Sequence, residues 1–303
     1  MIHVFYHSAD LDGMCSGAIV KHVFTDCELY GINYGQDFPW DKIQQDDTVF
    51  MVDFGLQPFD GMVRLNGMCK LHWIDHHKTA LDDAYKAGFL ASGGQLLVDG
   101  RSGCELTWEY VSNMRDPGNP SLPPEPLAVH LLGRYDVWDH SDPRALQFQY
   151  GMRQFKDTYP ENQELWQRAF YSEGFTDMVV KDGRLLLEYE DSQNAKFCKA
   201  YAFETELCLG HKDCPTEWPT HMFPAVCVNR GFTNSKVFDS VYDPTKHLLM
   251  ITFCRLKLPA RKWTVSLYST RDDVDCGAIA REFGGGGHRG AAGFQCENLP
   301  FDH

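Results

Sequence analysis

Short apolar runs alternate with longer stretches of helical spacing through the first half of the chain. Residues 2–6, 48–53 and 70–74 are dominated by β-branched, aromatic and other apolar side chains, the composition of buried strands. Residues 14–24 instead place apolar side chains at the spacing of one helix face. Strands that alternate with helices in this way predict a parallel sheet with crossover helices.

Helical patterns continue into the middle of the chain. Ser102 is followed three residues later by Glu105, a capping-box pattern that predicts a helix over residues 101–111. The unpaired N–H groups at the start of that helix could also hold an anion. Five prolines within residues 115–126 predict a surface loop, after which residues 126–135 return to a helical pattern.

The C-terminal third of the chain has a different pattern. Strand-like runs cover residues 225–228, 248–253 and 263–268, and a helix-like run over 276–283 precedes the glycine-rich stretch GGGGHRGAAGF. No fixed-period repeat is present in the chain, so the sequence does not predict a solenoid.

The stretch between these two patterns is charged, amphipathic and largely free of proline over residues 163–200, which predicts one or more long helices. We therefore predict a two-domain α/β protein: a larger parallel-sheet domain over residues 1–160, a helical connector over 161–200 and a smaller mixed α/β domain over 201–303.

Composition narrows the possible partners and the compartment. The 303 residues include 42 acidic and 28 basic side chains, a formal charge of −14, which argues against a protein that coats nucleic acids. A short oligonucleotide or single nucleotide remains compatible with that charge. Eleven cysteines, no leader-like N-terminus and no long apolar window predict a cytoplasmic protein with reduced thiols and no membrane partner.

Acidic and histidine side chains follow the predicted strands and one helix in four clusters. The clusters are His7, Asp10 and Asp12; Asp53; Asp75, His76 and His77; and Asp136. Taken singly, an Asp at a strand end more often caps a helix or forms a turn. The carboxyl ends of parallel strands meet at one edge of the sheet, however, so four such clusters should converge. Crowded carboxylates repel unless a cation lies between them, and carboxylate with imidazole suits Mn²⁺, so the pattern predicts a metal centre.

These clusters lie in segments that resemble a known family. HSADLDG, MVDFG, WIDHHKT and GRYDVWDH resemble the four motifs of the DHH phosphoesterase superfamily, and EFGGGGHRGAAGF resembles the signature of its DHHA1 domain. Size and motif spacing are most similar to the oligoribonuclease branch, which includes enzymes that degrade very short RNAs and others that open cyclic nucleotides.

The resemblance implies two divalent metal ions, usually Mn²⁺ with Mg²⁺ or Co²⁺ as alternatives, bridged by Asp53. His7 and Asp10 would complete one metal site, and Asp12, His76 and Asp136 the other. His77 would face the substrate phosphate, and Asp75 would orient a ligand histidine. The residues that would contact the nucleotide are Gly286, Gly287, His288 and Arg289. The chain departs from the family pattern at Tyr268, where related sequences often have arginine.

The implied reaction is metal-dependent hydrolysis of phosphodiester bonds, in short RNA or DNA oligonucleotides from the 3′ side or in cyclic nucleotides. A water activated between two metals would attack the phosphorus, and the substrate should bind between the two domains. A phosphatase acting on 3′-phosphoadenosine 5′-phosphate remains open because it would use the same site. The charge disfavours a RecJ-like exonuclease, and the glycine run disfavours a pyrophosphatase.

A non-catalytic nucleotide sensor is the alternative from another class, and it would have lost one or more metal ligands. None of the expected ligand positions is missing from this sequence. A homodimer is possible on this evidence, and nothing in the sequence decides it.

A second group of metal-binding residue types lies at Cys208, His211, Cys214 and His221. Cysteine and histidine at short spacing can bind zinc, but these intervals fit no standard zinc finger. With two prolines interleaved, a surface insertion is the favoured interpretation.

Overall fold

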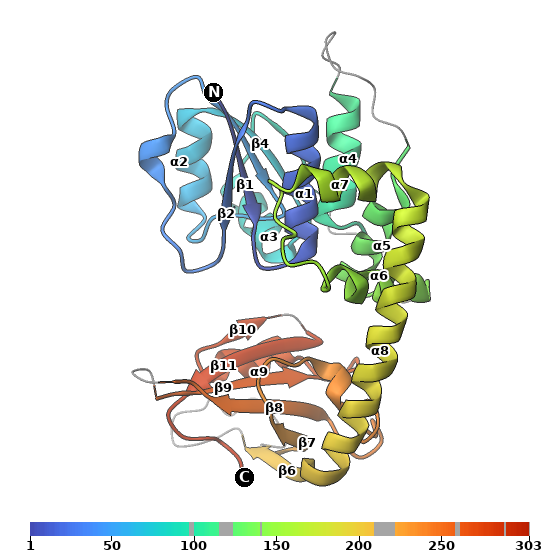
Figure 1. Cartoon of the computed structure of the whole chain (residues 1–303). Helices are drawn as coiled ribbons and strands as arrows, with labels where there is room; N and C mark the ends of the chain where they lie inside the picture. The colour runs from blue at the N-terminus through green and yellow to red at the C-terminus, as the bar shows by residue number, and fades with distance from the viewer. Residues whose placement is uncertain are drawn as a thin grey trace. The chain divides into compact units, whose positions relative to one another are not determined.

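The computed structural model describes residues 1–96, 100–114, 124–139, 141–208, 222–257, 261–287 and 289–302. The chain divides into two compact units, Met1–Leu187 and Glu188–His303. Figure 1 labels most of the helices and strands of each unit.

A five-stranded parallel sheet forms the centre of the first unit in its described residues. In spatial order its strands are β2 (Glu28–Ile32), β1 (Ile2–His7), β3 (Thr48–Val52), β4 (Lys70–Asp75) and β5 (Gly93–Leu96). The central strands read as nearly continuous apolar runs because both faces of a parallel sheet are covered. The predicted parallel sheet is thereby confirmed.

Helices cover both faces of this sheet (Figure 1). They are α1 (Leu11–Val23) and α4 (Gly103–Asn113) on one face and α2 (Asp60–Met68) and α3 (Lys78–Ala87) on the other. Successive side chains of β1 point to opposite faces. Val4 packs with Val20 of α1 and Leu106 of α4, while Phe5 packs with Leu65 of α2.

A layer of further helices packs against α1 and α4. It contains α5 (Leu127–Asp136), α6 (Pro143–Met152), α7 (Gln163–Tyr171) and the first half of α8 (Glu173–Tyr201). Ile19, Trp108, Phe148 and Trp166 form much of their shared core. The predicted helical stretch over residues 163–200 is therefore two helices, which separate at Ser172.

The second unit contains a six-stranded mixed sheet in its described residues, in the order β10-β11-β9-β8-β7-β6. The elements are β6 (Phe203–Cys208), β7 (Met222–Asn229), β8 (Leu249–Arg255), β9 (Trp263–Tyr268), α9 (Cys276–Glu282), β10 (Gly286–Gly287) and β11 (Ala291–Cys296). Strands β7 and β8 are parallel, and the other neighbouring pairs are antiparallel. Ile279 of α9 packs on one face, and Phe238 and Cys198 pack on the other. The predicted α/β class with a mixed second sheet is confirmed.

Two short 3-10 helices, Trp40–Lys42 and Ser235–Phe238, complete the described elements. Among the helices described, none combines the length and the apolar character needed to cross a membrane.

Candidate metal centre

The first three acidic or histidine clusters lie at the carboxyl edge of the parallel sheet. His7 ends β1, Asp53 directly follows β3, and Asp75 ends β4. The chain leaves β1 toward β2 on one side and returns in β3 on the other, so the strand order reverses at this point. Such a reversal opens a crevice beyond the strand ends, where α/β proteins bind ligands.

His7, Asp10 and Asp53 form one group whose ligand atoms all lie within 4.8 Å of one another. The Nδ1 atom of His7 lies 3.0 Å from Oδ2 of Asp10 and 3.7 Å from Oδ2 of Asp53. Asp10 is also the N-cap of α1, because its Oδ1 accepts a hydrogen bond of 2.9 Å from the backbone N–H of Gly13. The cap therefore leaves Oδ2 facing His7.

Asp12, His76 and Asp136 form a second group of the same size. The Nε2 atom of His76 lies 3.2 Å from Oδ2 of Asp136 and 3.7 Å from Oδ2 of Asp12. The same nitrogen lies 3.2 Å from Oδ1 of Asp53, whose other oxygen faces His7. Asp53 therefore lies between the two groups with one carboxylate oxygen toward each.

The carboxylates at this edge are buried and close to one another. Asp53 is 1% exposed and Asp12 is 3% exposed. Burial and the charge of Asp12 raise the pKa of Asp53, and burial with the charges of Asp12 and Asp53 raises the pKa of Asp136. Among the described residues nothing donates a hydrogen bond to Oδ1 of Asp53. Carboxylate oxygens and imidazole nitrogens with unmet charge fit divalent ions such as Mn²⁺, so these residues could hold two.

The backbone at Asp53 has an unusual conformation. Its φ of 54° lies in the left-handed region, which non-glycine residues adopt at a cost and which is frequent at functional sites. A Cβ atom on Gly103, at the start of α4, would lie 2.6 Å from the Cβ of Asp53. Only glycine therefore allows α4 to approach this residue so closely.

The side chain of Asp75 contacts the ring of His77 and not that of His76, the predicted metal ligand. Its Oδ1 accepts hydrogen bonds from the backbone N–H groups of His76 (2.8 Å) and His77 (3.1 Å), and it lies 2.7 Å from Nδ1 of His77. Burial lowers the pKa of His77, but the hydrogen bond and charge of Asp75 outweigh burial and raise it to about 9. For His7, too, burial lowers the pKa, and contacts with Asp10 and Asp53 raise it to about 10.

Tyr34 borders the centre, although the sequence offered no pattern that indicated it. Its ring centroid lies 5.7 Å from that of His7 and 4.7 Å from that of Phe54, and the residue is 47% exposed. A turn places it there: the Gln36 N–H donates to the Asn33 carbonyl, and Gly35 supplies the positive φ of 82° that the turn requires. Tyr34 follows β2, a strand that its sequence does not predict.

The glycine motif lies in the second unit. Gly286 and Gly287 form β10, and a Cβ on Gly287 would lie 2.6 Å from the Cα of Ala292 in the paired strand β11. The close approach of the two backbones explains the glycine there. The Arg289 guanidinium donates to the carbonyl of Asp272. His288 lies outside the described residues, and the substrate contacts of this motif stay a prediction.

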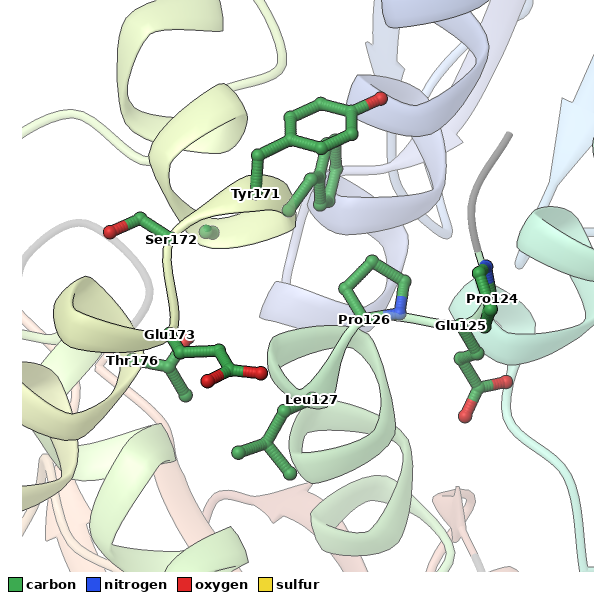
Figure 2. Close-up of a pocket in the computed structure, with 10 residues that line it drawn as sticks. Pro124, Glu125, Pro126, Leu127, Tyr171, Ser172, Glu173 and Thr176 are labelled. Atoms are coloured by element: carbon green, nitrogen blue, oxygen red, sulfur yellow. The ribbon is translucent and has the colours of Figure 1, made fainter. Parts of the chain in front are cut away.

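Two further features lie apart from the metal centre. His211, Cys214 and His221 fall outside the described residues, so the zinc interpretation and its loop alternative stay predictions. A pocket of about 360 Å³ lies between the start of α5 and the junction of α7 and α8, and Figure 2 shows residues that line it. None of the predicted site residues is among the described residues that line this pocket.

Comparisons with known proteins agree with this geometry. Residues 1–133 match the model of the DHH family, N-terminal domain. The chain is 26% identical over 327 residues to an uncharacterised protein of Acanthamoeba polyphaga mimivirus, covering 99% of this chain and 69% of that protein. It is 24% identical over 317 residues to the oligoribonuclease NrnB of Bacillus subtilis, covering 97% and 72%.

Solved structures show a similar fold. The DHH domain of a member of the s1p family of ribosomal proteins matches with a TM-score of 0.56 at 11% identity, covering 96% of this chain and 82% of that one. A pGpG-specific phosphodiesterase from Vibrio cholerae matches with a TM-score of 0.50 at 12% identity, covering 97% and 92%. The four motifs and the parallel sheet agree with the family match, so residues 1–133 are similar to the N-terminal domain of the DHH family, which supports the resemblance to the DHH phosphoesterase superfamily.

Proposed function

We propose that this protein is a metal-dependent phosphodiesterase that hydrolyses short oligonucleotides from the 3′ side or cyclic nucleotides. One observation carries the proposal: Asp53 presents one carboxylate oxygen to each of two carboxylate-histidine groups. Two divalent ions held close together are a common arrangement in enzymes that hydrolyse phosphate esters.

In this proposal His7 and Asp10 would hold one ion, Asp12, His76 and Asp136 would hold the other, and Asp53 lies between the two groups. When bound, such a pair of ions would supply a water molecule of lowered pKa and neutralise charge on the phosphate oxygens. Mn²⁺ is the best match to the mixed carboxylate and imidazole ligands, with Mg²⁺ and Co²⁺ as alternatives.

His77 has a separate role toward the substrate. Asp75 engages Nδ1 of the ring and keeps a proton there, so the ring meets a phosphate through Nε2. In the metal-free protein, contact with Asp75 raises the pKa of His77 to about 9, which favours a proton on the ring. From this position it stabilises the developing negative charge and donates a proton to the leaving oxygen.

The aromatic border of the centre favours a nucleotide substrate. Tyr34 packs on Phe54, and 47% of its surface remains exposed beside His7. An exposed aromatic ring next to a phosphate site is suited to stacking on a base. Two similar proteins, an oligoribonuclease and a pGpG-specific phosphodiesterase, also support a nucleotide substrate.

A substrate panel tests the proposal. The full chain is incubated with Mn²⁺ and, in separate reactions, RNAs of two to five nucleotides, cyclic mononucleotides, cyclic dinucleotides and 3′-phosphoadenosine 5′-phosphate. We expect mononucleotides from the short RNAs or linear products from a cyclic nucleotide, and loss of the activity in Asp53→Asn. Release of phosphate from 3′-phosphoadenosine 5′-phosphate alone would replace the proposal with the phosphatase, and tight binding without any product would replace it with the nucleotide sensor.

A further inference from the structure

The start of α4 makes a direct contact with one of the carboxylates of the metal centre. The backbone N–H of Gly103 donates to Oδ2 of Asp12 at 2.7 Å, and that of Cys104 donates to Oδ1 at 2.9 Å. The first N–H groups of a helix have no partner within the helix and favour negative charge. Asp12 lies on α1, so these two hydrogen bonds join segments about ninety residues apart and prevent the carboxylate from rotating.

The space at this contact admits only glycine. A Cβ on Gly103 would lie 2.6 Å from the Cβ of Asp53 and 2.8 Å from its Cγ and Oδ1. Real Cβ atoms do not approach other atoms this closely, and the buried carboxylate of Asp53 has little room to move. Any side chain at position 103 must therefore push α4 away from Asp53 and Asp12.

A partly buried ion pair stabilises the start of α4. Glu105 closes the capping box by accepting a hydrogen bond of 3.0 Å from the backbone N–H of Ser102. The same carboxylate oxygen of Glu105 lies 2.5 Å from Nη2 of Arg134. The residue Glu105 is 2% exposed. Arg134 lies on α5 two residues before Asp136, so the pair connects the start of α4 to the helix end that carries another metal ligand.

Close packing between α4 and α5 supports that connection. A Cβ on Gly133 would lie 2.6 Å from Cδ of Glu105 and 2.7 Å from Oγ of Ser102. The backbone of α5 therefore rests directly on the capping box. A shift of α4 must consequently move α5 as well, and with it Asp136.

We propose that the start of α4, defined as the Gly103 and Cys104 amides with the Glu105–Arg134 pair, positions the ligand group of Asp12, His76 and Asp136. The two amides contact the proposed ligand Asp12, and the Glu105–Arg134 pair acts through α4 and α5, so these residues are positioning residues. Groups that orient metal ligands commonly change metal affinity 10- to 100-fold when they are altered. The inference rests on the proposed function, which supplies the two metal ions. It adds that the affinity for the ion at Asp12, His76 and Asp136 depends on α4 more than the affinity for the other ion does.

Manganese binding tests this inference without turnover. Calorimetric titration with Mn²⁺ and electron paramagnetic resonance are applied to the wild type, Gly103→Ala and the control Gly67→Ala. Gly67 lies in α2, and a Cβ there would meet no atom within 4 Å. For the wild type and Gly67→Ala we expect two ions and a spin-coupled spectrum. For Gly103→Ala we expect one ion to bind about 10- to 100-fold more weakly, with an uncoupled spectrum at low Mn²⁺.

If circular dichroism shows that Gly103→Ala does not fold, a second pair of variants tests the inference. Glu105→Gln keeps an acceptor for Ser102 but removes the charge that attracts Arg134, and we expect the same selective weakening of one ion. Its control is Glu109→Gln, which breaks an exposed pair of α4 with Arg101. A folded Gly103→Ala variant with wild-type Mn²⁺ affinities and a spin-coupled spectrum would overturn the inference. If Gly103→Ala does not fold, the same result in Glu105→Gln would overturn it. A wild type that binds no Mn²⁺ would contradict the proposed function and remove the basis of the inference with it.

Discussion

At the scale of single residues, the centre concentrates charge where water is excluded. Asp53 combines a buried carboxylate with a left-handed backbone, and both features cost folding free energy in the absence of a cation. Asp tolerates this backbone region better than most residues because its short side chain interacts locally. The observed conformation places each oxygen toward a different ligand group, which accounts for an Asp at this position.

The exposed ring of Tyr34 gives a prediction about substrate binding. Tyr34→Ala removes a stacking surface that is worth about 1–3 kcal/mol per base in comparable sites. We expect KM for a dinucleotide substrate to rise by roughly 5- to 100-fold with a smaller change in kcat, because the ring contacts no reacting atom. Tyr34→Phe keeps the ring and should keep KM, so an equal loss in both variants would argue against stacking.

The two histidines with raised pKa values predict how the metal-free protein responds to pH. Their folded pKa values, about 10 for His7 and about 9 for His77, lie above the unfolded value of 6.5. A group with a raised folded pKa stabilises the fold below its unfolded pKa and loses that contribution as pH rises through the folded value. In EDTA, the unfolding temperature should therefore fall between pH 6.5 and 10.

Mn²⁺ should remove most of this dependence, because metal binding competes with protons for the same ligands. Buried Asp53 and Asp136, whose pKa values are also raised, act in the same direction. A metal-free protein whose unfolding temperature is constant or rises over this pH range would contradict the assignment of charge.

At the scale of elements, each proposed ligand lies at or next to the end of a strand or helix, and some of the contacts that hold it there also stabilise that element. Asp10 is the clearest case, since one oxygen caps α1 and the other faces His7. Asp10→Asn keeps the capping oxygen and removes the charge, so it should weaken Mn²⁺ binding, and in EDTA it should lose the stability of the ion pair with His7 but not that of the cap.

Asp10→Ala removes both functions and should also lower the free energy of unfolding in EDTA by about 1 kcal/mol. Chemical denaturation and Mn²⁺ titration of the two variants measure the two effects separately. Equal stability of Asp10→Asn and Asp10→Ala would show that the cap contributes nothing.

The elements that the sequence predicted correctly are those with strong local patterns. Strands β1, β3 and β4 are continuous apolar runs, and α4 begins with a complete capping box. Strands β2 and β5 were not predicted because ELYGI and GGQL are short, polar or glycine-rich segments at the sheet edges. Their conformation depends on pairing with a neighbouring strand, which a local pattern does not contain.

The same distinction applies to the centre. The ligand residues could be proposed from sequence because strand ends of a parallel sheet converge. The roles of Tyr34 and Gly103 depend on distances to residues remote in sequence, such as the approach of Gly103 to Asp53, and no spacing in the sequence reports them. For Asp75, the sequence predicted that it orients a ligand histidine, whereas in the structure its side chain contacts the ring of His77, the residue expected to face the substrate.

At the scale of the whole molecule, a chain with a formal charge of −14 is proposed to act on a negatively charged substrate. A negative protein and a negative substrate repel each other, but local charge governs binding more than net charge does. Cations bound at the carboxyl edge of the parallel sheet would neutralise the carboxylates there and allow the substrate to bind. The reversal of strand order between β1 and β3 opens a crevice at this edge. The buried carboxylates there repel one another, and bound cations would relieve that repulsion.

Anomalous diffraction at the manganese edge, from crystals grown with Mn²⁺, tests this account most directly. We expect two peaks roughly 3.5–4 Å apart, with an oxygen of Asp53 on each, His7 and Asp10 on one, and Asp12, His76 and Asp136 on the other. Density without a manganese peak near Asp53, or with Asp12, Asp53 and Asp136 turned away from one another, would contradict it.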